Sequence, residues 1–342
     1  MTNRLTTKVG RLTLPNPVIC GSGEPVMTEA GIRAALAAGA AGVIAKSVNE
    51  RPDAARQLDL ADYIALDVAG ARSLFNRSGL TFRETGDWFR AIAEIDRQAA
   101  HTGRFVAASI VYAEAPGAIA IATMAREAGL RVFELNVGAP HASEAAAGAI
   151  TQETDPERLR DLVANVRKAT DGMELWVKLT GLSSNLPALA LAARDGGADA
   201  VCMMGRFMAM IPDLDSFAPI LGTSAAYGGG WALPIVCRFL AQSRRAVGPE
   251  FSLMGTNGVR SGLDVARMAL SGASAVEVLS IVMHQGFDAI TQMIAELDQF
   301  LATRDLTFAA LVGQTADRLG GYGAQASNPD RWRDFVPPET LT

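Results

Sequence analysis

The residues of this sequence best placed to do chemistry are two lysines and an asparagine that end short apolar segments. Lys46 comes after GVIA, Lys178 comes after LWV, and Asn136 ends the segment VFELN. A partly desolvated ammonium group can neutralise a phosphate, hold a negatively charged ring or form a Schiff base. The alternative for either lysine is a surface position from which its ammonium group reaches past the rim of the fold into water.

The elements that must position these side chains alternate between strand and helix along the chain. Apolar segments typical of buried strands cover residues 17–20, 42–45, 105–109, 132–136, 174–179, 200–203, 251–254 and 275–279. Helical patterns lie between and after them at residues 28–38, 88–101, 116–128, 155–170, 186–195, 233–247, 261–271 and 283–301. Eight strands alternating with helices predict an α/β fold, a (β/α)8 TIM barrel, in which all strand ends meet at one mouth.

Three segments fall outside this repeat. Residues 8–18 alternate apolar and polar side chains around Gly10, which predicts an N-terminal hairpin that closes the barrel floor. Residues 47–86, after strand 2, and residues 206–231, after strand 6, exceed normal loop lengths. We expect these two long loops to carry function, because long insertions on a scaffold usually do.

A phosphate site is predicted near the end of the chain. Barrels commonly hold a phosphate between the loops after strands 7 and 8, by backbone N–H groups. Here these loops are residues 255–261 and 279–281, and Gly258 permits close backbone approach or a positive φ. The alternative is a strand–helix–strand unit with an ordinary glycine turn.

Composition and charge favour one domain that binds small molecules. With 342 residues, of which 49% are hydrophobic and 20% charged, the chain can bury one large core. We expect a single domain over residues 1–342, with its core at about 8–302 and a C-terminal extension at 303–342. The net charge of −5 and the lack of basic runs interleaved with aromatic residues argue against nucleic acid as a partner and against an anionic membrane surface.

The cysteines and the N-terminus add two expectations. Cys20, Cys202 and Cys237 are isolated from one another, so they predict neither disulfides nor a zinc or iron–sulfur site, and no metal is expected. The N-terminus lacks the apolar core of a signal peptide, and the apolar run at residues 34–45 is too short to span a bilayer. A cytoplasmic location without membrane contact is the default expectation.

A set of motifs resembles a known family when taken in order. GRLTLPNPVICGSG, GVIAKS, FNRSGL, ELNVGAPH, WVKLTG, YGGG and GTNGVRSGLDVARMALSGASAVEV are similar to segments of the dihydroorotate dehydrogenases and of the pyrimidine-reducing part of dihydropyrimidine dehydrogenase. The resemblance covers roughly residues 8–287. It implies an FMN-binding (β/α)8 barrel, with the flavin phosphate in the two loops after strands 7 and 8, and it suggests a homodimer.

The resemblance also implies roles for individual residues. The positions that match cofactor contacts are Gly21, Ser22, Lys46, Ser47, Asn136, Lys178, Gly228, Gly229, Asn257, Gly258, Leu279 and Ser280. The positions on the substrate side are Asn76, Ser78, Gly79, Leu80, Asn136, His141 and Arg206. These matches favour a small, planar substrate that forms hydrogen bonds.

The sequence departs from the family at the catalytic base. Dihydroorotate dehydrogenases have a cysteine or serine where this chain has Ala139, and residues 147–152 lack the acid cysteine of dihydropyrimidine dehydrogenase. A positioned base contributes about 10²–10⁴-fold to such a reaction. His141 is the best replacement, because imidazole titrates near neutral pH. Lys46 is a second catalytic candidate. Weaker candidates are Ser143, Thr151 and a substrate hydroxyl, and His141 has the alternative of a hydrogen-bonding contact only.

A second departure is Arg206, where the family usually has asparagine followed by threonine or serine. A planar guanidinium on the substrate side favours a carboxylate or another anion. The alternative is an ion pair with Asp213 or Asp215 in the same long loop.

Three functions are compatible with these observations. The first is an FMN-dependent oxidoreductase acting on CH–CH bonds, which transfers a hydride between flavin N5 and a small cyclic or unsaturated substrate, including an anionic one. The second is a non-redox barrel lyase or aldolase that uses Lys178 as a Schiff-base amine on a phosphorylated substrate. The third is a flavin-binding subunit without its own activity. The sequence does not identify the electron acceptor or donor, since it has no G-x-G-x-x-G after a strand and no cysteine cluster.

Overall fold

The computed structural model describes residues 4–51, 59, 61–68, 71–138 and 153–341. Its centre is a closed barrel of parallel strands that neighbour one another in chain order, with the last strand beside the first. The strands are β3 (Val18–Cys20), β4 (Gly42–Ile44), β7 (Phe105–Val111), β8 (Val132–Asn136), β9 (Glu174–Lys178), β10 (Ala200–Met203), β13 (Ser252–Thr256) and β14 (Ala273–Val278). The predicted (β/α)8 barrel is confirmed.

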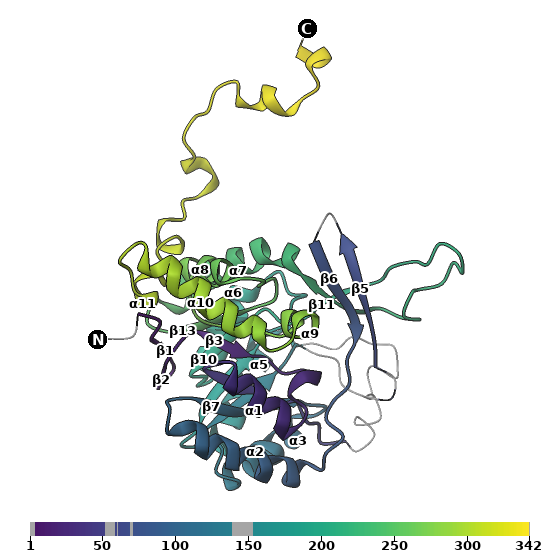
Figure 1. Ribbon diagram of the computed structural model, residues 1–342, viewed down its shortest axis with the longest axis vertical. Coiled ribbons are helices and arrows are strands. Elements are labelled where there is room, and N and C mark those ends of the chain that lie inside the picture. Colours follow the sequence, from purple (N-terminus) through teal and green to yellow (C-terminus); the bar gives the residue numbers. More distant parts are fainter. Residues whose placement is uncertain (1–3, 52–58, 60, 69–70, 139–152, 342) are drawn as a thin grey trace.

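Helices surround the barrel (Figure 1). They include α1 (Glu29–Ala37), α2 (Thr85–Ala100), α3 (Ala115–Glu127), α5 (Pro156–Ala169), α6 (Leu186–Asp195), α7 (Leu233–Val247), α8 (Gly262–Leu270), α9 (Ser280–Gln285) and α10 (Asp288–Ala302). The single helix predicted at 283–301 is wrong in one respect, because it is two helices. They separate at Gly286, whose φ of 78° is one that glycine adopts without strain.

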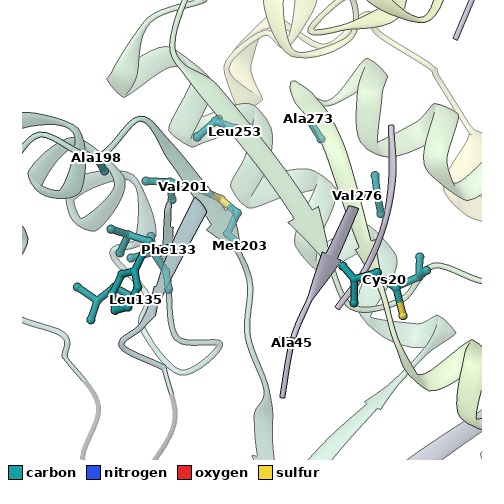
Figure 2. Packing of buried hydrophobic residues seen from close by; sticks show 14 of the residues in the cluster. Cys20, Ala45, Phe133, Leu135, Ala198, Val201, Met203, Leu253, Ala273 and Val276 are labelled. Carbon is teal, nitrogen blue, oxygen red and sulfur yellow. The ribbon is translucent and has the colours of Figure 1, made fainter. Parts of the chain in front are cut away.

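Each strand divides its side chains between two layers. Residues that point outward, such as Phe133, Leu135, Val201 and Met203, pack beneath the helices (Figure 2). The inward side chains in the lower barrel form a separate apolar cluster, in which Phe105 meets Trp176 edge to face at 5.0 Å between ring centroids. This alternation also places polar residues of the strand ends inside the barrel mouth.

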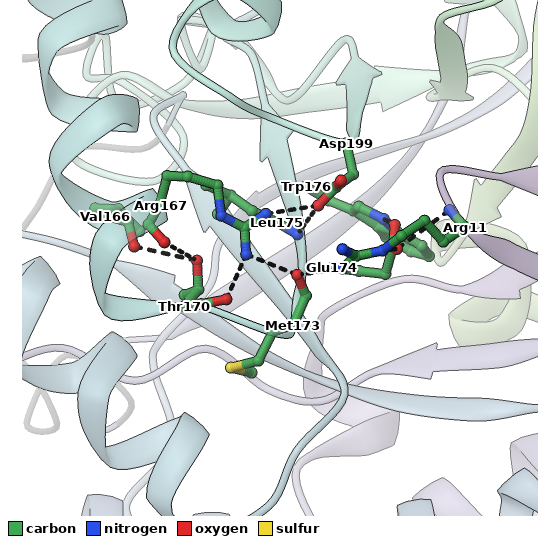
Figure 3. A network of polar contacts seen from close by, with 9 residues as sticks. All are labelled: Arg11, Val166, Arg167, Thr170, Met173, Glu174, Leu175, Trp176 and Asp199. Atoms are coloured by element: carbon green, nitrogen blue, oxygen red, sulfur yellow. Dashed lines mark hydrogen bonds and ion pairs between the residues drawn. The ribbon is translucent and has the colours of Figure 1, made fainter.

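The barrel floor is closed by the predicted hairpin, β1 (Thr7–Val9) and β2 (Leu12–Leu14). Val9 and Leu14 belong to the inner apolar cluster. A polar network also holds this end (Figure 3), where Arg11 donates to Glu174 at 2.7 Å and Arg167 donates to Asp199 at 2.7 Å. The structural role predicted for the hairpin is therefore visible in its contacts.

The two long segments after strands 2 and 6 were predicted to be loops, and this prediction is wrong in part because both contain strands. They contain β5 (Asp62–Val68), β6 (Ala71–Arg77), β11 (Phe207–Ala209) and β12 (Ala225–Gly229), which form one antiparallel sheet in the order β11-β12-β6-β5. An isolated hairpin is marginal in water, whereas more strands with an apolar face are stable. Phe75, Leu221 and Ala225 supply that face, so each segment folds by pairing with the other. We call this the insertion sheet.

The chain beyond α10 first packs on the barrel and then leaves it. In α11 (Phe308–Leu311), Phe308 and Leu311 are buried, and Gly313 donates a backbone hydrogen bond to Ala269. After Leu319 the chain extends away from the barrel (Figure 1). Within the described residues, no helix combines the length and the apolar character needed to cross a bilayer.

Candidate active site

A pocket lies at the carboxyl ends of the barrel strands, where the insertion sheet forms one of its walls. Its lining includes most of the residues singled out from the sequence: Gly21, Ser22, Lys46, Ser47, Asn76, Ser78, Gly79, Leu80, Asn136, Lys178, Arg206, Gly228, Asn257, Leu279 and Ser280. These residues come from segments far apart in the sequence, yet the fold brings them to one cavity. Their roles in binding or catalysis stay predictions.

Two predicted cofactor residues lie behind this lining. Gly229 pairs with Ser73 of β6, and a Cβ on Gly229 would lie 2.4 Å from the Ser73 hydroxyl oxygen. Gly258 has a φ of 88°, and a Cβ there would lie 2.4 Å from the backbone nitrogen of Leu233. Both positions therefore depend on the absence of a side chain. The candidate base His141 lies outside the described residues, as do Ala139, Ser143 and Thr151.

Lys46 is held in an ion pair with Glu24, a residue that no sequence motif indicated. Its Nζ lies 2.9 Å from Oε1 of Glu24, which also lines the pocket, and only 4% of Lys46 is exposed. Burial lowers the pKa of Lys46 although Glu24 opposes that shift. Burial raises the pKa of Glu24, but the Lys46 charge and hydrogen bonds outweigh it, so the Glu24 pKa is lowered. The Lys46 ammonium group is therefore already paired with the Glu24 carboxylate.

Tyr63 of the insertion sheet stands next to this pair. Its hydroxyl is buried, and burial together with the neighbouring Glu24 carboxylate raises the Tyr63 pKa. Tyr63 is thus a neutral phenol at physiological pH. No sequence motif pointed to Tyr63, because the segment that forms β5 was expected to be a loop.

Arg206 makes a different contact from the one considered in the sequence. Its Nη2 donates to the Ser78 hydroxyl at 3.0 Å. The alternative of an ion pair with Asp213 or Asp215 is wrong, because no carboxylate among the described residues lies within ion-pair distance of Arg206. Asp213 instead accepts hydrogen bonds from Ser216. Burial lowers the pKa of Arg206, but guanidinium remains charged at any physiological pH. Arg206 therefore brings to the pocket wall a positive charge without a salt-bridge partner among the described residues, although the Glu24 carboxylate acts on it at longer range.

Lys178 lies between two carboxylates inside the barrel mouth. Its Nζ forms a short contact with Glu277 and lies 3.8 Å from Oε2 of Glu134. Both glutamates are buried completely or nearly so. Burial lowers the pKa of Lys178, but the two carboxylates outweigh burial and raise it. A firmly protonated amine is a poor nucleophile, which argues against Lys178 as a Schiff-base residue.

Glu277 could have been found from the sequence. It interrupts the apolar strand AVEV at an inward position, and charged residues are almost never fully buried unless they are paired. The partner, Lys178, lies 99 residues earlier and reaches Glu277 only through barrel closure. Glu24 gave no comparable signal, since it follows a glycine turn in a short 3-10 segment, η1 (Glu24–Val26).

The remaining walls are aromatic and amide groups. Tyr227 lines the pocket and stacks on Trp231 with ring centroids 4.9 Å apart. Asn136 accepts a hydrogen bond from the Gly138 N–H at 3.0 Å, and the Asn257 amide donates to the Gly205 carbonyl at 3.2 Å. Gly228 lies against Asn257, where a Cβ would meet Oδ1 at 2.8 Å. The pocket thus combines flat surfaces with fixed hydrogen-bonding groups.

Comparison with known proteins decides the family. Residues 4–301 match the family model described as dihydroorotate dehydrogenase. The chain belongs to the dihydroorotate dehydrogenase family. It is therefore an oxidoreductase of the kind that acts on CH–CH bonds, and the family resemblance read from the motifs is confirmed.

The relatives compared here fall into two named groups. The chain is 28% identical over 311 residues to the dihydroorotate dehydrogenase B (NAD(+)) catalytic subunit of Methanocella arvoryzae, covering 91% of this chain and 97% of that protein. Identity is also 28% over 301 residues to the same subunit of Methanothermobacter thermautotrophicus, covering 87% and 93%. Dihydroorotate dehydrogenase A (fumarate) of Limosilactobacillus reuteri is 32% identical over 165 residues, covering 48% of this chain and 52% of that protein.

Proposed function

We propose that this protein is an FMN-dependent oxidoreductase that moves a hydride between flavin N5 and a carbon of a small, anionic, cyclic or unsaturated substrate. The observation that carries the proposal is the convergence of strand-end residues Ser22, Lys46, Asn136 and Lys178 with the insertion-sheet residue Asn76 in one pocket. Catalysis of this kind relies on the cofactor for redox chemistry and on the protein for orientation and charge.

The residues present fit a flavin phosphate. Asn257 and Gly258 have consecutive positive φ values of 77° and 88°, so the chain turns tightly after β13. A Cβ at Gly258 would collide with the backbone of Leu233, so glycine lets this turn pack against the start of α7. Backbone N–H groups of such a turn and of a helix start are the kind of donors that hold a phosphate. We assign the phosphate to this loop and to Leu279 and Ser280, with Gly228 and Gly229 closing the other side.

The ring side is assigned to Gly21, Ser22, Lys46, Ser47, Asn136 and Lys178, all of which line the pocket. FMN, when bound, supplies the hydride acceptor. Lys178 keeps its charge because Glu134 and Glu277 surround it, so it can hold the polar edge of the ring. Asn136 lies where strand β8 meets the pocket and can hydrogen-bond to ring or substrate.

The substrate side is assigned to Asn76, Ser78, Gly79, Leu80 and Arg206. Because Glu24 already neutralises Lys46, the charge available to a substrate anion on this wall is that of Arg206. Ser78 positions the guanidinium. The planar guanidinium of Arg206 can therefore bind a carboxylate or a similar anion of the substrate through two hydrogen bonds.

Proton transfer needs a group other than the family's cysteine or serine. We keep His141 as the proposed acid or base and Lys46 as its proposed catalytic companion, held by Glu24. We also propose a homodimer in the cytoplasm, with a separate molecule or subunit as electron acceptor or donor. Names of relatives in both the NAD(+) and the fumarate groups are compatible with an external acceptor.

The test is a visible absorption spectrum of the purified protein after incubation with FMN, repeated anaerobically with dihydroorotate, dihydrouracil and related cyclic acids. We expect a bound flavin spectrum that bleaches with an anionic compound. A protein that stays colourless after reconstitution would overturn the proposal. Gly258→Ala should weaken FMN binding, whereas the matched control Gly129→Ala, at another positive φ of 84° with open space around its Cβ, should leave binding unchanged.

A further inference from the structure

A buried carboxyl pair lies beneath the pocket floor. Glu134 of β8 and Glu277 of β14 are 0% and 1% exposed, and both contact the same ammonium group of Lys178. One oxygen of each carboxyl group, Oε2 of Glu134 and Oε1 of Glu277, is buried without a hydrogen-bond partner. One ammonium cannot neutralise two buried carboxylates, and an unpaired buried charge is very costly. Neutrality requires one proton on the pair.

Burial and the Glu277 charge raise the pKa of Glu134 to about 8, while Lys178 and hydrogen bonds keep the pKa of Glu277 lowered against the effect of burial. At neutral pH the proton therefore belongs mainly to Glu134. Two interacting carboxyl groups titrate as a pair, so the proton is best described as shared.

A chain of serine hydroxyls joins this pair to the pocket. Ser109 donates to Oε1 of Glu134 at 3.0 Å, Ser47 lies 2.9 Å from Ser109, and Ser22 lies 3.0 Å from Ser47. A hydroxyl has one proton to donate. Since Ser109 uses its proton on Glu134, Ser47 must donate to Ser109, and Ser22 must donate to Ser47. The three hydroxyls point in one direction, from the pocket lining at Ser22 to the buried pair.

We propose that Glu134 and Glu277 share one proton beside Lys178, and that Ser22, Ser47 and Ser109 conduct protons between this pair and the pocket. The pair is thus a charge-compensating site that responds to the ligand next to Lys178. In its redox role, the inference rests on the proposed function. Transfer of a hydride from the substrate to FMN, if FMN is bound here, would add one negative charge next to Lys178. Below pH 8 the pair already holds its proton and stabilises that charge. Above pH 8, where the pair has lost its proton, that charge would favour uptake of one proton from water through the serines.

The shared proton can be tested in the protein without any cofactor. We would titrate the protein with pH while recording the infrared C=O stretch of protonated carboxyl groups. The expected result is a buried carboxyl band that is present at pH 6 and disappears with a midpoint near pH 8. Glu134→Gln should abolish this band. The absence of the band from the folded wild-type protein at pH 6 would overturn the inference.

Two further variants separate this role from a structural one. Glu277→Gln removes the second carboxylate, so Lys178 alone can neutralise Glu134 and the midpoint of the Glu134 band should move well below pH 8. Circular dichroism checks that this variant is folded. Glu174→Gln is the matched control, because Glu174 is a buried carboxylate on β9 at the barrel floor, paired with Arg11. It should leave the band unchanged. A band that vanishes in Glu174→Gln but survives in Glu134→Gln would contradict the assignment.

The redox role is tested by measuring how the midpoint potential of bound FMN changes with pH. Uptake of one extra proton per two electrons steepens the slope by about 30 mV per pH unit. We expect this extra slope above pH 8, where the pair loses its proton in the oxidised protein, and its loss in Glu134→Gln. Equal slopes in both proteins would refute the compensating role. If the protein binds no FMN, the proposed function fails, while the infrared titration still decides the shared proton.

Discussion

Replacing Arg206 by glutamine is the sharpest perturbation of the proposed substrate side of the pocket. Glutamine keeps much of the length and some hydrogen bonding to Ser78, but it removes the guanidinium charge, whose only described side-chain hydrogen bond is to Ser78. Of the five N–H donors of arginine, that contact uses one, so the planar fork remains available to a ligand. A hydrogen bond to a charged group contributes about 1.5–3 kcal/mol. At about 1.4 kcal/mol per factor of ten, Arg206→Gln should lower kcat/KM for an anionic substrate by about 10–150-fold.

The assay compares a pair of substrates that differ in charge, dihydroorotate and dihydrouracil, by steady-state turnover with an artificial electron acceptor. We expect the loss with the anionic substrate alone and only a small change with the neutral one. Arg206→Lys should recover part of the loss, because it restores the charge without the planar fork. Arg238→Gln, on the exposed face of α7, is the control. Equal losses for charged and neutral substrates would refute the reasoning, since they would show that Arg206 acts through the fold.

Two other predictions concern the buried charges. Glu24→Gln leaves Lys46 buried without a counter-charge. Breaking a buried ion pair in this way should lower the free energy of unfolding, measured by urea denaturation, by about 3 kcal/mol. An unchanged urea midpoint would contradict this prediction and show that Lys46 finds another partner. Because the folded-state pKa of Glu134 is raised to about 8, the folded protein binds more protons than the unfolded chain between the ordinary glutamate pKa and pH 8. Stability should therefore fall as pH rises from 5 to 8, and Glu134→Gln should flatten this decline in denaturation curves collected across that range.

The barrel could be predicted because its signals are local. Each strand is a short apolar segment before a polar residue, so Lys46, Asn136 and Lys178 were placed at the mouth from their immediate neighbours. Alternation along β8 and β9 then fixes which side chains enter the barrel. These are properties of a few consecutive residues, and tertiary contacts did not reverse them.

The insertion sheet and the ion pairs could not be predicted because their partners are distant. Strand β6 pairs with β12, about 150 residues later. Each also pairs with a strand of its own insertion, β6 with β5 and β12 with β11, but neither two-stranded unit forms the whole sheet without the other. The pairs of Lys46 with Glu24 and of Lys178 with Glu277 likewise depend on which loops meet after closure. Gly286 shows the opposite case, where a local glycine signal within a predicted helix was present but was not used.

The pocket is lined by two structural units, the barrel and the insertion sheet, and a mutation in one unit need not affect the other. Barrel strands and the turn after β13 supply Lys178 and Asn257, whereas the two insertions supply Asn76, Tyr227 and Arg206. Mutations in the sheet can alter which molecule is accepted without touching a residue that closes the barrel. Because β6 and β12 share one hydrogen-bonded ladder, however, a length change in one insertion shifts the register of the other. Substrate choice in this scaffold should therefore change through paired changes in both insertions, a rule that directed-evolution libraries can build in from the start.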